Sequence, residues 1–292
     1  MNQTAELILD CKCQLGEGAI WHPGRQQLFF LDINEQTLFA VDAKGSIVDQ
    51  WLFNETIAAA GIVDDETLVL FSEFGLKGFQ IATGGLAPLT QIEADNNRTR
   101  SNDSRVHPSG AFWLGTMDNT ETEGPIGALY HYRSGVLTQL KSGVRVPNST
   151  CFSPDGRTAY WTDTPSKQIL KVATDPTTGM PVGDWSVFAD VSDGRGYPDG
   201  AVVDSEGYLW NAKWGGSCVV RHAPDGAIDR IIEVPVSQVT CPAFGGPDLK
   251  TLFITTAAKN LSEDQLAAEK VAGGLFAIEV DIAGQLEARV IL

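Results

Sequence analysis

Residues 102–117, NDSRVHPSGAFWLGTM, decide the fold of this chain. They combine a short polar strand, the turn His107-Pro108-Ser109-Gly110 and an apolar strand, which is typical of an antiparallel hairpin. The same turn followed by an apolar stretch occurs six times, and the turns begin at His22, Asp64, His107, Ser153, Asp204 and Gly246. The intervals of 42, 43, 46, 51 and 42 residues between them indicate a repeated structural unit.

Each repeat divides into four short strands. In the third repeat these are residues 104–106, 111–117, 127–132 and 136–140. Six repeats of four antiparallel strands, with no helical periodicity before residue 262, predict an all-β, six-bladed β-propeller that occupies residues 1–292 as a single domain. A β-sandwich would explain the short strands but not the period.

Closing the ring requires one further strand on the last blade. Residues 5–10 precede the first blade, where a fourth strand would lie, and residues 286–292 follow the last one. One of these two segments should pair with the last blade, because an open edge would leave backbone groups unpaired. The sequence leaves the choice between them open.

The composition excludes several classes of partner. The formal net charge is −16, so neither nucleic acid nor an anionic membrane is an expected partner. No apolar run is long enough to cross a bilayer, and the first residues lack the features of a signal peptide, which makes the cytoplasm the expected location. The five cysteines are expected to be reduced and structural, since Cys11 and Cys13 are too close for an ordinary bridge and form no CxxC motif.

The residue five positions before each turn is the candidate functional position. The six residues are Glu17, Ala59, Asn102, Asn148, Asp199 and Cys241. Because the inner strands of such a ring all begin on one face, these side chains should converge at one mouth of the channel. Four of them carry carboxylate or carboxamide oxygens, which suit a hard divalent cation. Arg100 lies two residues before Asn102, on the same face, where it could hold a polar ligand.

Other kinds of site are not expected. The four histidines, in turns of the opposite face or on third strands, are expected to be structural or solvated; they are His22, His107, His131 and His222. Without a His/Cys cluster, a dedicated zinc site is not expected. The chain also lacks a G-x-S-x-G nucleophile elbow, a P-loop and a dinucleotide-binding fingerprint.

Long irregular segments lie on the same face as the candidate position. They are residues 93–100, 118–126, 190–198 and 257–273. The last one contains Ser262-Glu263-Asp264-Gln265, a capping-box pattern that predicts a short helix. This segment can be either a lid or an ordinary surface excursion. Four tryptophans in or beside the strands are expected to pack between blades; they are Trp21, Trp113, Trp161 and Trp210.

Several motifs resemble those of the senescence-marker-protein/gluconolactonase/regucalcin family of six-bladed propellers. They include Leu15-Gly16-Glu17-Gly18, Arg100-Ser101-Asn102-Asp103, Gly127-Ala128-Leu129-Tyr130, Pro147-Asn148-Ser149, Pro198-Asp199-Gly200 and Asp204-Ser205-Glu206-Gly207. The motifs span nearly all of the chain in the family's order, and the subtype resembles the bacterial sugar lactonases of this family.

The resemblance implies a metal-dependent enzyme. One divalent ion, Ca²⁺, Mg²⁺, Mn²⁺ or Zn²⁺, would be held by Glu17, Asn148 and Asp199 at the mouth of the channel. Asp199 would also be the catalytic acid/base that opens sugar lactones to aldonic acids in a sugar-acid catabolic pathway. Gluconolactone and pentonolactones such as L-arabinonolactone are examples of such substrates.

The resemblance also implies which residues contact the substrate. Arg100, Asn102 and Glu123 would bind it, with Glu121 as the rival of Glu123 because this loop varies. A small sugar lactone is thus the expected partner of a monomer or weak homo-oligomer. Two other functions stay open: a non-enzymatic calcium-binding or ligand-sensing propeller, and a related metal-dependent phosphotriesterase or esterase.

Overall fold

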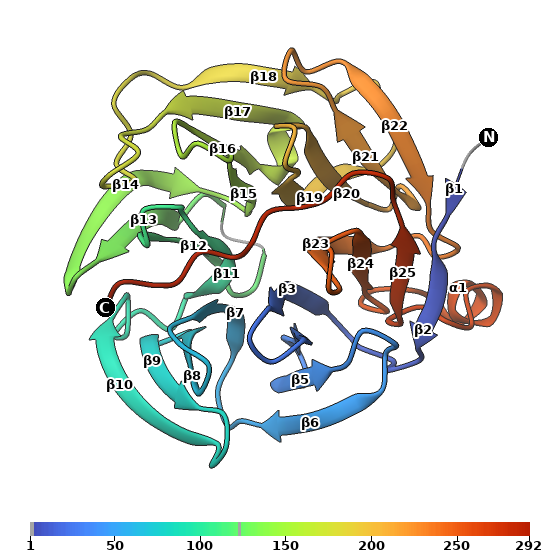
Figure 1. Ribbon diagram of the computed structural model, residues 1–292, viewed down its shortest axis with the longest axis horizontal. Helices are drawn as coiled ribbons and strands as arrows, with labels where there is room; N and C mark the ends of the chain where they lie inside the picture. Colours follow the sequence, from blue (N-terminus) through green and yellow to red (C-terminus); the bar gives the residue numbers. More distant parts are fainter. Residues whose placement is uncertain (1–2, 122–123) are drawn as a thin grey trace.

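The computed structural model describes residues 3–121 and 124–292, which form a ring of six antiparallel sheets around a central channel (Figure 1). This confirms the predicted six-bladed β-propeller. From the inner strand outward, blade one consists of β3 (Gly16–His22), β4 (Gln27–Asp32), β5 (Thr37–Val41) and β6 (Ile47–Leu52), and blade two of β7 (Ile57–Ile62), β8 (Thr67–Ser72), β9 (Gly75–Gln80) and β10 (Gly85–Gln91).

The remaining blades follow the same order. Blade three consists of β11 (Thr99–Val106), β12 (Phe112–Asp118), β13 (Gly127–Arg133) and β14 (Val136–Val144), and blade four of β15 (Pro147–Phe152), β16 (Thr158–Asp163), β17 (Gln168–Ala173) and β18 (Ser186–Asp190). Blade five consists of β19 (Tyr197–Val203), β20 (Leu209–Trp214), β21 (Cys218–His222) and β22 (Ile228–Glu233), and blade six of β23 (Val239–Gly245), β24 (Thr251–Thr256), β25 (Leu275–Glu279) and β2 (Glu6–Leu9).

The first described residues close the ring. Strand β2 pairs antiparallel with β25, with Leu7 opposite Phe276, and becomes the outer strand of blade six. Strand β1 (Gln3–Thr4) then pairs in parallel with β22, so the N-terminal segment joins blades five and six. Of the two segments that the sequence left open, residues 5–10 therefore supply the closing strand.

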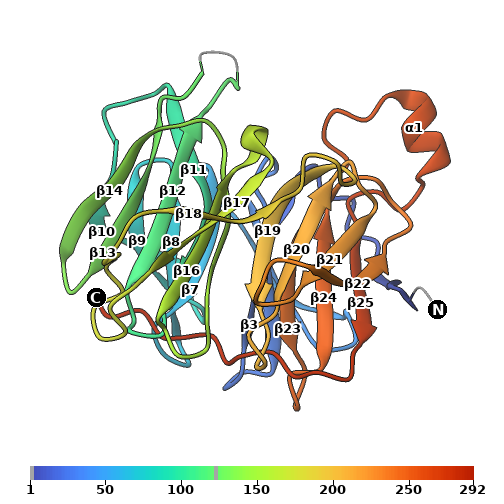
Figure 2. The ribbon, with the colours of Figure 1, turned by 90° about the horizontal axis from the view of Figure 1, so that it is seen from above.

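Residues 283–292, the C-terminal tail, cross the face of the ring opposite to helix α1 (Glu263–Ala268) (Figure 2). Val290 and Ile291 donate backbone hydrogen bonds to blades two and three, and Gly284 donates one to blade six. The side chain of Gln285 donates to carbonyl groups of blades four and five. The tail therefore ties together five of the six blades.

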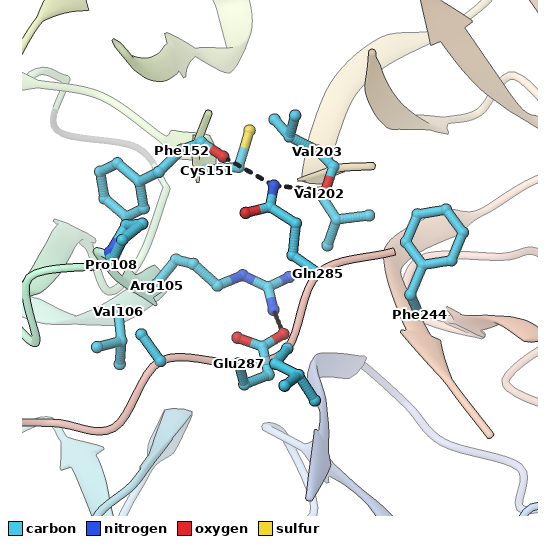
Figure 3. A pocket seen from close by; sticks show the side chains of 12 residues that line it. Arg105, Val106, Pro108, Cys151, Phe152, Val202, Val203, Phe244, Gln285 and Glu287 are labelled. Atoms are coloured by element: carbon cyan, nitrogen blue, oxygen red, sulfur yellow. Dashed lines mark hydrogen bonds and ion pairs between the residues drawn. The ribbon is translucent and has the colours of Figure 1, made fainter. Parts of the chain in front are cut away.

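A buried ion pair holds the middle of the tail. Glu287 of the tail accepts a hydrogen bond of 2.5 Å from the guanidinium of Arg105 on β11 (Figure 3). The side chains of Arg105 and Glu287 are only 9% and 15% exposed. A second ion pair of the tail, Arg289 with Asp65 at 3.0 Å, is about 60% exposed at both partners.

The four tryptophans lie buried in the sheets, as predicted. Trp113 packs edge-on against Phe152 of the next blade, with ring centroids 5.3 Å apart. Trp21 of blade one stacks on Phe253 of blade six at 5.7 Å. Aromatic contacts of this kind add to the burial of apolar surface between neighbouring sheets.

The histidines are structural, and all four are buried. His22 contacts a backbone carbonyl of the next turn, Asp64, at 3.0 Å, and His107 contacts Gly156 O at the same distance. The predicted short helix is present as α1, with the capping box formed at Ser262 and Gln265. Within the described part of the chain, we find no helix with the length and apolar character that crossing a bilayer demands.

The two ion pairs of the tail give a test of what holds it. In Glu287→Ala, Arg105 keeps its charge in a buried position without the carboxylate that pairs with it, so we expect a loss of about 3 kcal/mol in the free energy of unfolding. In Arg289→Ala, which breaks the exposed pair, the loss should stay below about 1 kcal/mol. Urea unfolding of both variants measures the two values, and equal losses would show that the burial of the first pair does not matter.

Candidate functional site

Four of the six candidate positions meet in one cavity at a mouth of the channel. Glu17, Asn102, Asn148 and Asp199 stand on the inner strands β3, β11, β15 and β19, and all four are buried. Together with Arg100 they line a cavity of about 190 Å³. The structure therefore brings together these five residues, although they come from four different blades.

A β-bulge explains why these side chains point into the cavity. In blade one the pairing shifts between Glu17 and Ile20, and each of the other inner strands has a shift at the corresponding place. A bulge interrupts the alternation of side chains and re-aims the residue beside it. Next to two of the candidates the backbone is left-handed, with φ of 61° at Gly18 and 57° at Ser149. A Cβ atom on Gly18 would lie 2.8 Å from the carbonyl oxygen of Ala58, so this bulge requires glycine.

Hydrogen bonds distinguish the two asparagines. Asn102 accepts from the Arg100 guanidinium at 2.9 Å through Oδ1 and donates through Nδ2 to Pro147 O at 2.9 Å. Asn148 donates through Nδ2 to Thr164 Oγ1 at 2.8 Å. The amide oxygen of Asn102 is thus engaged by Arg100. Among the described residues, the amide oxygen of Asn148 accepts only one long hydrogen bond, of 3.4 Å, from Asn102 Nδ2. Asn148 is therefore the better donor of an oxygen ligand.

The surroundings of the two acidic residues, Glu17 and Asp199, disfavour their ionised forms. Burial, together with the nearby Asp103 carboxylate, raises the pKa of Glu17 to about 8. Burial and the neighbouring Glu17 likewise raise the pKa of Asp199 well above its ordinary value. The two cationic side chains at the cavity, Lys259 and Arg100, contact a third carboxylate. Lys259 pairs with Glu121, and the Arg100 guanidinium lies 4.0 Å from the same group.

The donor set fits a hard divalent cation. Glu17 and Asp199 offer carboxylate oxygens and Asn148 an amide oxygen, which are the ligands that Ca²⁺, Mg²⁺ and Mn²⁺ prefer. A bound cation would also favour the ionised forms of these carboxyl groups and so oppose the effect of burial on their pKa values. Within residues 3–121 and 124–292 no group of three or more His, Cys, Asp and Glu side chains is placed to bind a metal, so the amide is needed to complete this set.

The predicted substrate contacts stay a prediction, and the structure gives only the positions of these residues. Arg100 and Asn102 lie beside the acidic residues in the cavity. Glu123 lies outside the described residues, whereas its rival Glu121 lines the cavity.

Seven further residues line the cavity without having been predicted as site residues. Three are apolar, namely Leu15, Met117 and Val146, and the other four are Thr164, Trp214, Lys259 and Asn260. Among these four, Thr164 begins a 3₁₀ turn, Thr164–Ser166, Trp214 is the last residue of β20, and Lys259 and Asn260 belong to the insertion of residues 257–273. None of them repeats from blade to blade, so the six-fold spacing contains no signal for them. The predicted long segment 257–273 was the one available hint for Lys259 and Asn260.

Comparison with known proteins agrees with this geometry. The family model described as the SMP-30/Gluconolactonase/LRE-like region matches residues 15–258. The chain belongs to this family. An L-arabinolactonase of Azospirillum brasilense is 34% identical to this family member over 98% of the chain and 95% of the relative, and a pentonolactonase of Haloferax volcanii is 33% identical over 98% of both.

A solved structure of the family has the same fold. It comes from Agrobacterium tumefaciens and is described as a calcium-binding protein, regucalcin. It superimposes with a TM-score of 0.96 at 35% identity and covers 100% of this chain and 99% of its own. The family resemblance inferred from the motifs is thereby confirmed.

The raised pKa of Glu17 predicts how stability depends on pH without a metal. A carboxyl group whose pKa is raised on folding contributes stability below its unfolded pKa, 4.5, and loses it as the pH rises through about 8. Glu17→Gln stays neutral and escapes this loss. Relative to the unchanged protein, the variant should gain on the order of 3 kcal/mol between pH 5 and pH 8.

Urea unfolding in the presence of a chelator measures this difference. Glu263→Gln, a change at an exposed glutamate of α1, is the control and should run parallel to the unchanged protein at every pH. If Glu17→Gln also runs parallel, Glu17 ionises at an ordinary pH and the account of its environment is wrong.

Proposed function

We propose that this protein hydrolyses sugar lactones with the help of one divalent metal ion. The observation that carries the proposal is a single cavity with oxygen donors on one side, Glu17, Asn148 and Asp199, and hydrogen-bonding groups on the other, Arg100 and Asn102. The lactonase names of relatives that match this chain over nearly its full length support the same chemistry. The substrate would be an aldonolactone with a five- or six-membered ring, and the product its aldonic acid.

The metal site would use the three oxygen donors. Glu17, Asn148 and Asp199 would hold the ion, since their side chains line one cavity and no arginine or lysine of the described chain forms an ion pair with either carboxylate. When bound, such an ion supplies Lewis-acid polarisation of a carbonyl group. The name of the calcium-binding relative is consistent with an ion of this hard type.

Asp199 would act as the acid/base. Its carboxylate would remove a proton from the attacking water and return it to the ring oxygen as the lactone opens. The main chain that carries it is fixed, because its carbonyl oxygen accepts hydrogen bonds from Ser149 Oγ at 2.7 Å and from Asn211 Nδ2 at 2.9 Å. A rigid backbone at this point holds the base in a constant direction.

Arg100 and Asn102 would orient the sugar. The Arg100 guanidinium also donates to Ser101 O at 2.8 Å, which holds it flat along β11 beside the cavity. Asn102 is fixed in turn by its bonds to Arg100 and Pro147. Hydroxyl groups of the sugar would bind to these residues, so that the carbonyl carbon is presented to the attacking water.

A non-enzymatic role is the second candidate. The description of one relative as calcium-binding fits a propeller that binds an ion, and it gives weaker support than the lactonase names do. Both candidates use the same oxygen donors, so metal binding alone does not separate them. Turnover separates them.

A panel of aldonolactones tests the proposed reaction. We expect proton release from five- or six-membered sugar lactones in the presence of Ca²⁺, Mg²⁺, Mn²⁺ or Zn²⁺, and loss of this activity after treatment with a chelator, because the carbonyl is then no longer polarised. A pH indicator follows the reaction, with a phosphotriester as a parallel substrate. Cleavage of the phosphotriester alone would identify the esterase alternative, and calorimetric metal binding without any turnover would identify the non-enzymatic one.

Asp199→Asn tests the acid/base. The amide has nearly the same shape but does not take up the proton, so kcat should fall by about 10³-fold with the fold intact by circular dichroism. Asp225→Asn, at an exposed aspartate in the turn between β21 and β22 of the same blade, is the matched control and should retain most of the activity. Full activity in Asp199→Asn would remove this residue from the mechanism.

A further inference from the structure

Cys11 and Cys13 lie close together at the start of blade one. Their sulfur atoms are 3.5 Å apart, with the thiol of Cys13 donating to Cys11 Sγ. The chain bends between them at Lys12, whose φ of 54° is left-handed. A residue other than glycine adopts this conformation rarely, and here the bend brings two thiols into contact that the sequence spacing alone made unsuitable for an ordinary bridge.

The two thiols differ in their access to solvent. Cys11 is half-buried, whereas Cys13 is 1% exposed, and the three other cysteines are buried as well. A dissolved oxidant therefore reaches Cys11 first. The hydrogen bond from Cys13 lowers the pKa of the Cys11 thiol, which favours the reactive thiolate.

The same segment holds both ends of the insertion 257–273. At one end, Ala258 N donates to Cys13 O at 3.1 Å. At the other end, Gly273 O accepts from Cys13 N at 2.9 Å and from Cys11 Sγ at 3.1 Å. The contact with Gly273 is tight, since a Cβ atom at this glycine would lie 2.3 Å from Cys13 O.

The insertion in turn forms part of the cavity wall. Lys259 follows Ala258 directly, lines the cavity together with Asn260, and pairs with Glu121 on the opposite loop. A movement of Cys13 would therefore shift the residues that cover the mouth.

We propose that Cys11 and Cys13 form a reversible dithiol–disulfide pair that controls how firmly the insertion 257–273 is held over the cavity. A peroxide is the oxidant. The Cys11 thiolate attacks one peroxide oxygen and becomes a sulfenic acid as the O–O bond breaks and a water leaves; the Cys13 sulfur then forms the S–S bond and expels a second water. Two electrons pass from the two thiols to one peroxide.

The bridge would change both contacts at the base of the insertion. The sulfur atoms would move from 3.5 Å to about 2 Å apart, which displaces Cys13. Cys11 would lose the S–H group that donates to Gly273 O. The insertion would therefore be held less firmly in the oxidised protein. A thiol reductant would restore the two thiols and with them the contacts to Gly273.

Thiol counting and hydrogen exchange on the whole protein test the proposal without any substrate. After one equivalent of hydrogen peroxide, alkylation in denaturant should modify three cysteines instead of five, in a monomer about 2 Da lighter. Amide exchange in residues 257–273 should become faster by about threefold or more, and dithiothreitol should reverse both changes.

Three serine variants serve as controls. Cys11→Ser should keep four modifiable thiols through the treatment, with unchanged exchange. Cys13→Ser should form no bridge, because the Cys11 sulfenic acid then has no partner thiol and is detected as a gain of about 16 Da. Cys218→Ser, at a buried cysteine away from the pair, should still lose two thiols. Five free thiols after peroxide, a sulfinic acid at Cys11 or a bridge between two molecules would each refute the pair. A bridge that leaves exchange in residues 257–273 unchanged would refute its control of the insertion.

Discussion

The pairing of β2 with β25 is the constraint on which the whole ring depends. Leu7 lies opposite Phe276, so residues from nearly opposite ends of the chain share one antiparallel ladder. Without it, blade six would present an open edge, and the ring would not be closed between blades six and one. The cavity draws its walls from blades one, three, four and five, and it exists only while the ring is closed.

The positions of the acidic and amide residues follow from a second constraint, the bulge in every inner strand. A regular strand would alternate its side chains between the two neighbouring blades, which is where Trp21 and Trp113 pack. At the bulge, one residue in each inner strand departs from this alternation, and its side chain is directed along the channel. Ala59 and Cys241 at this position bring no ligand or charge. Glu17 and Asp199 bring two carboxyl groups into a buried place, and their pKa values are raised chiefly by this burial and further by neighbouring carboxylates.

The six-fold spacing was sufficient to predict the number of blades, the strand order and the face on which the candidate residues lie, because each depends on a pattern that repeats. It predicted the inner strand of blade three as residues 104–106, whereas β11 is Thr99–Val106, since residues 99–101 pair with β12 beyond the bulge. Ring closure was undecidable, as either terminal segment had the hydrogen-bonding capacity for it. Thr164, in a 3₁₀ turn, and Trp214, at the end of β20, were missed because neither occupies the position that repeats from blade to blade.

The C-terminal tail has a consequence for the order of events in synthesis. It follows the strands of all six blades in the chain, yet it contacts five of the blades and carries an acidic partner of the buried Arg105. Blades one to five can assemble while residues 283–292 are still inside the ribosome, but Arg105 lacks its partner Glu287 until that segment leaves the exit tunnel. Emergence of the tail, rather than completion of the sixth blade, is thus the step that completes the contacts across the ring.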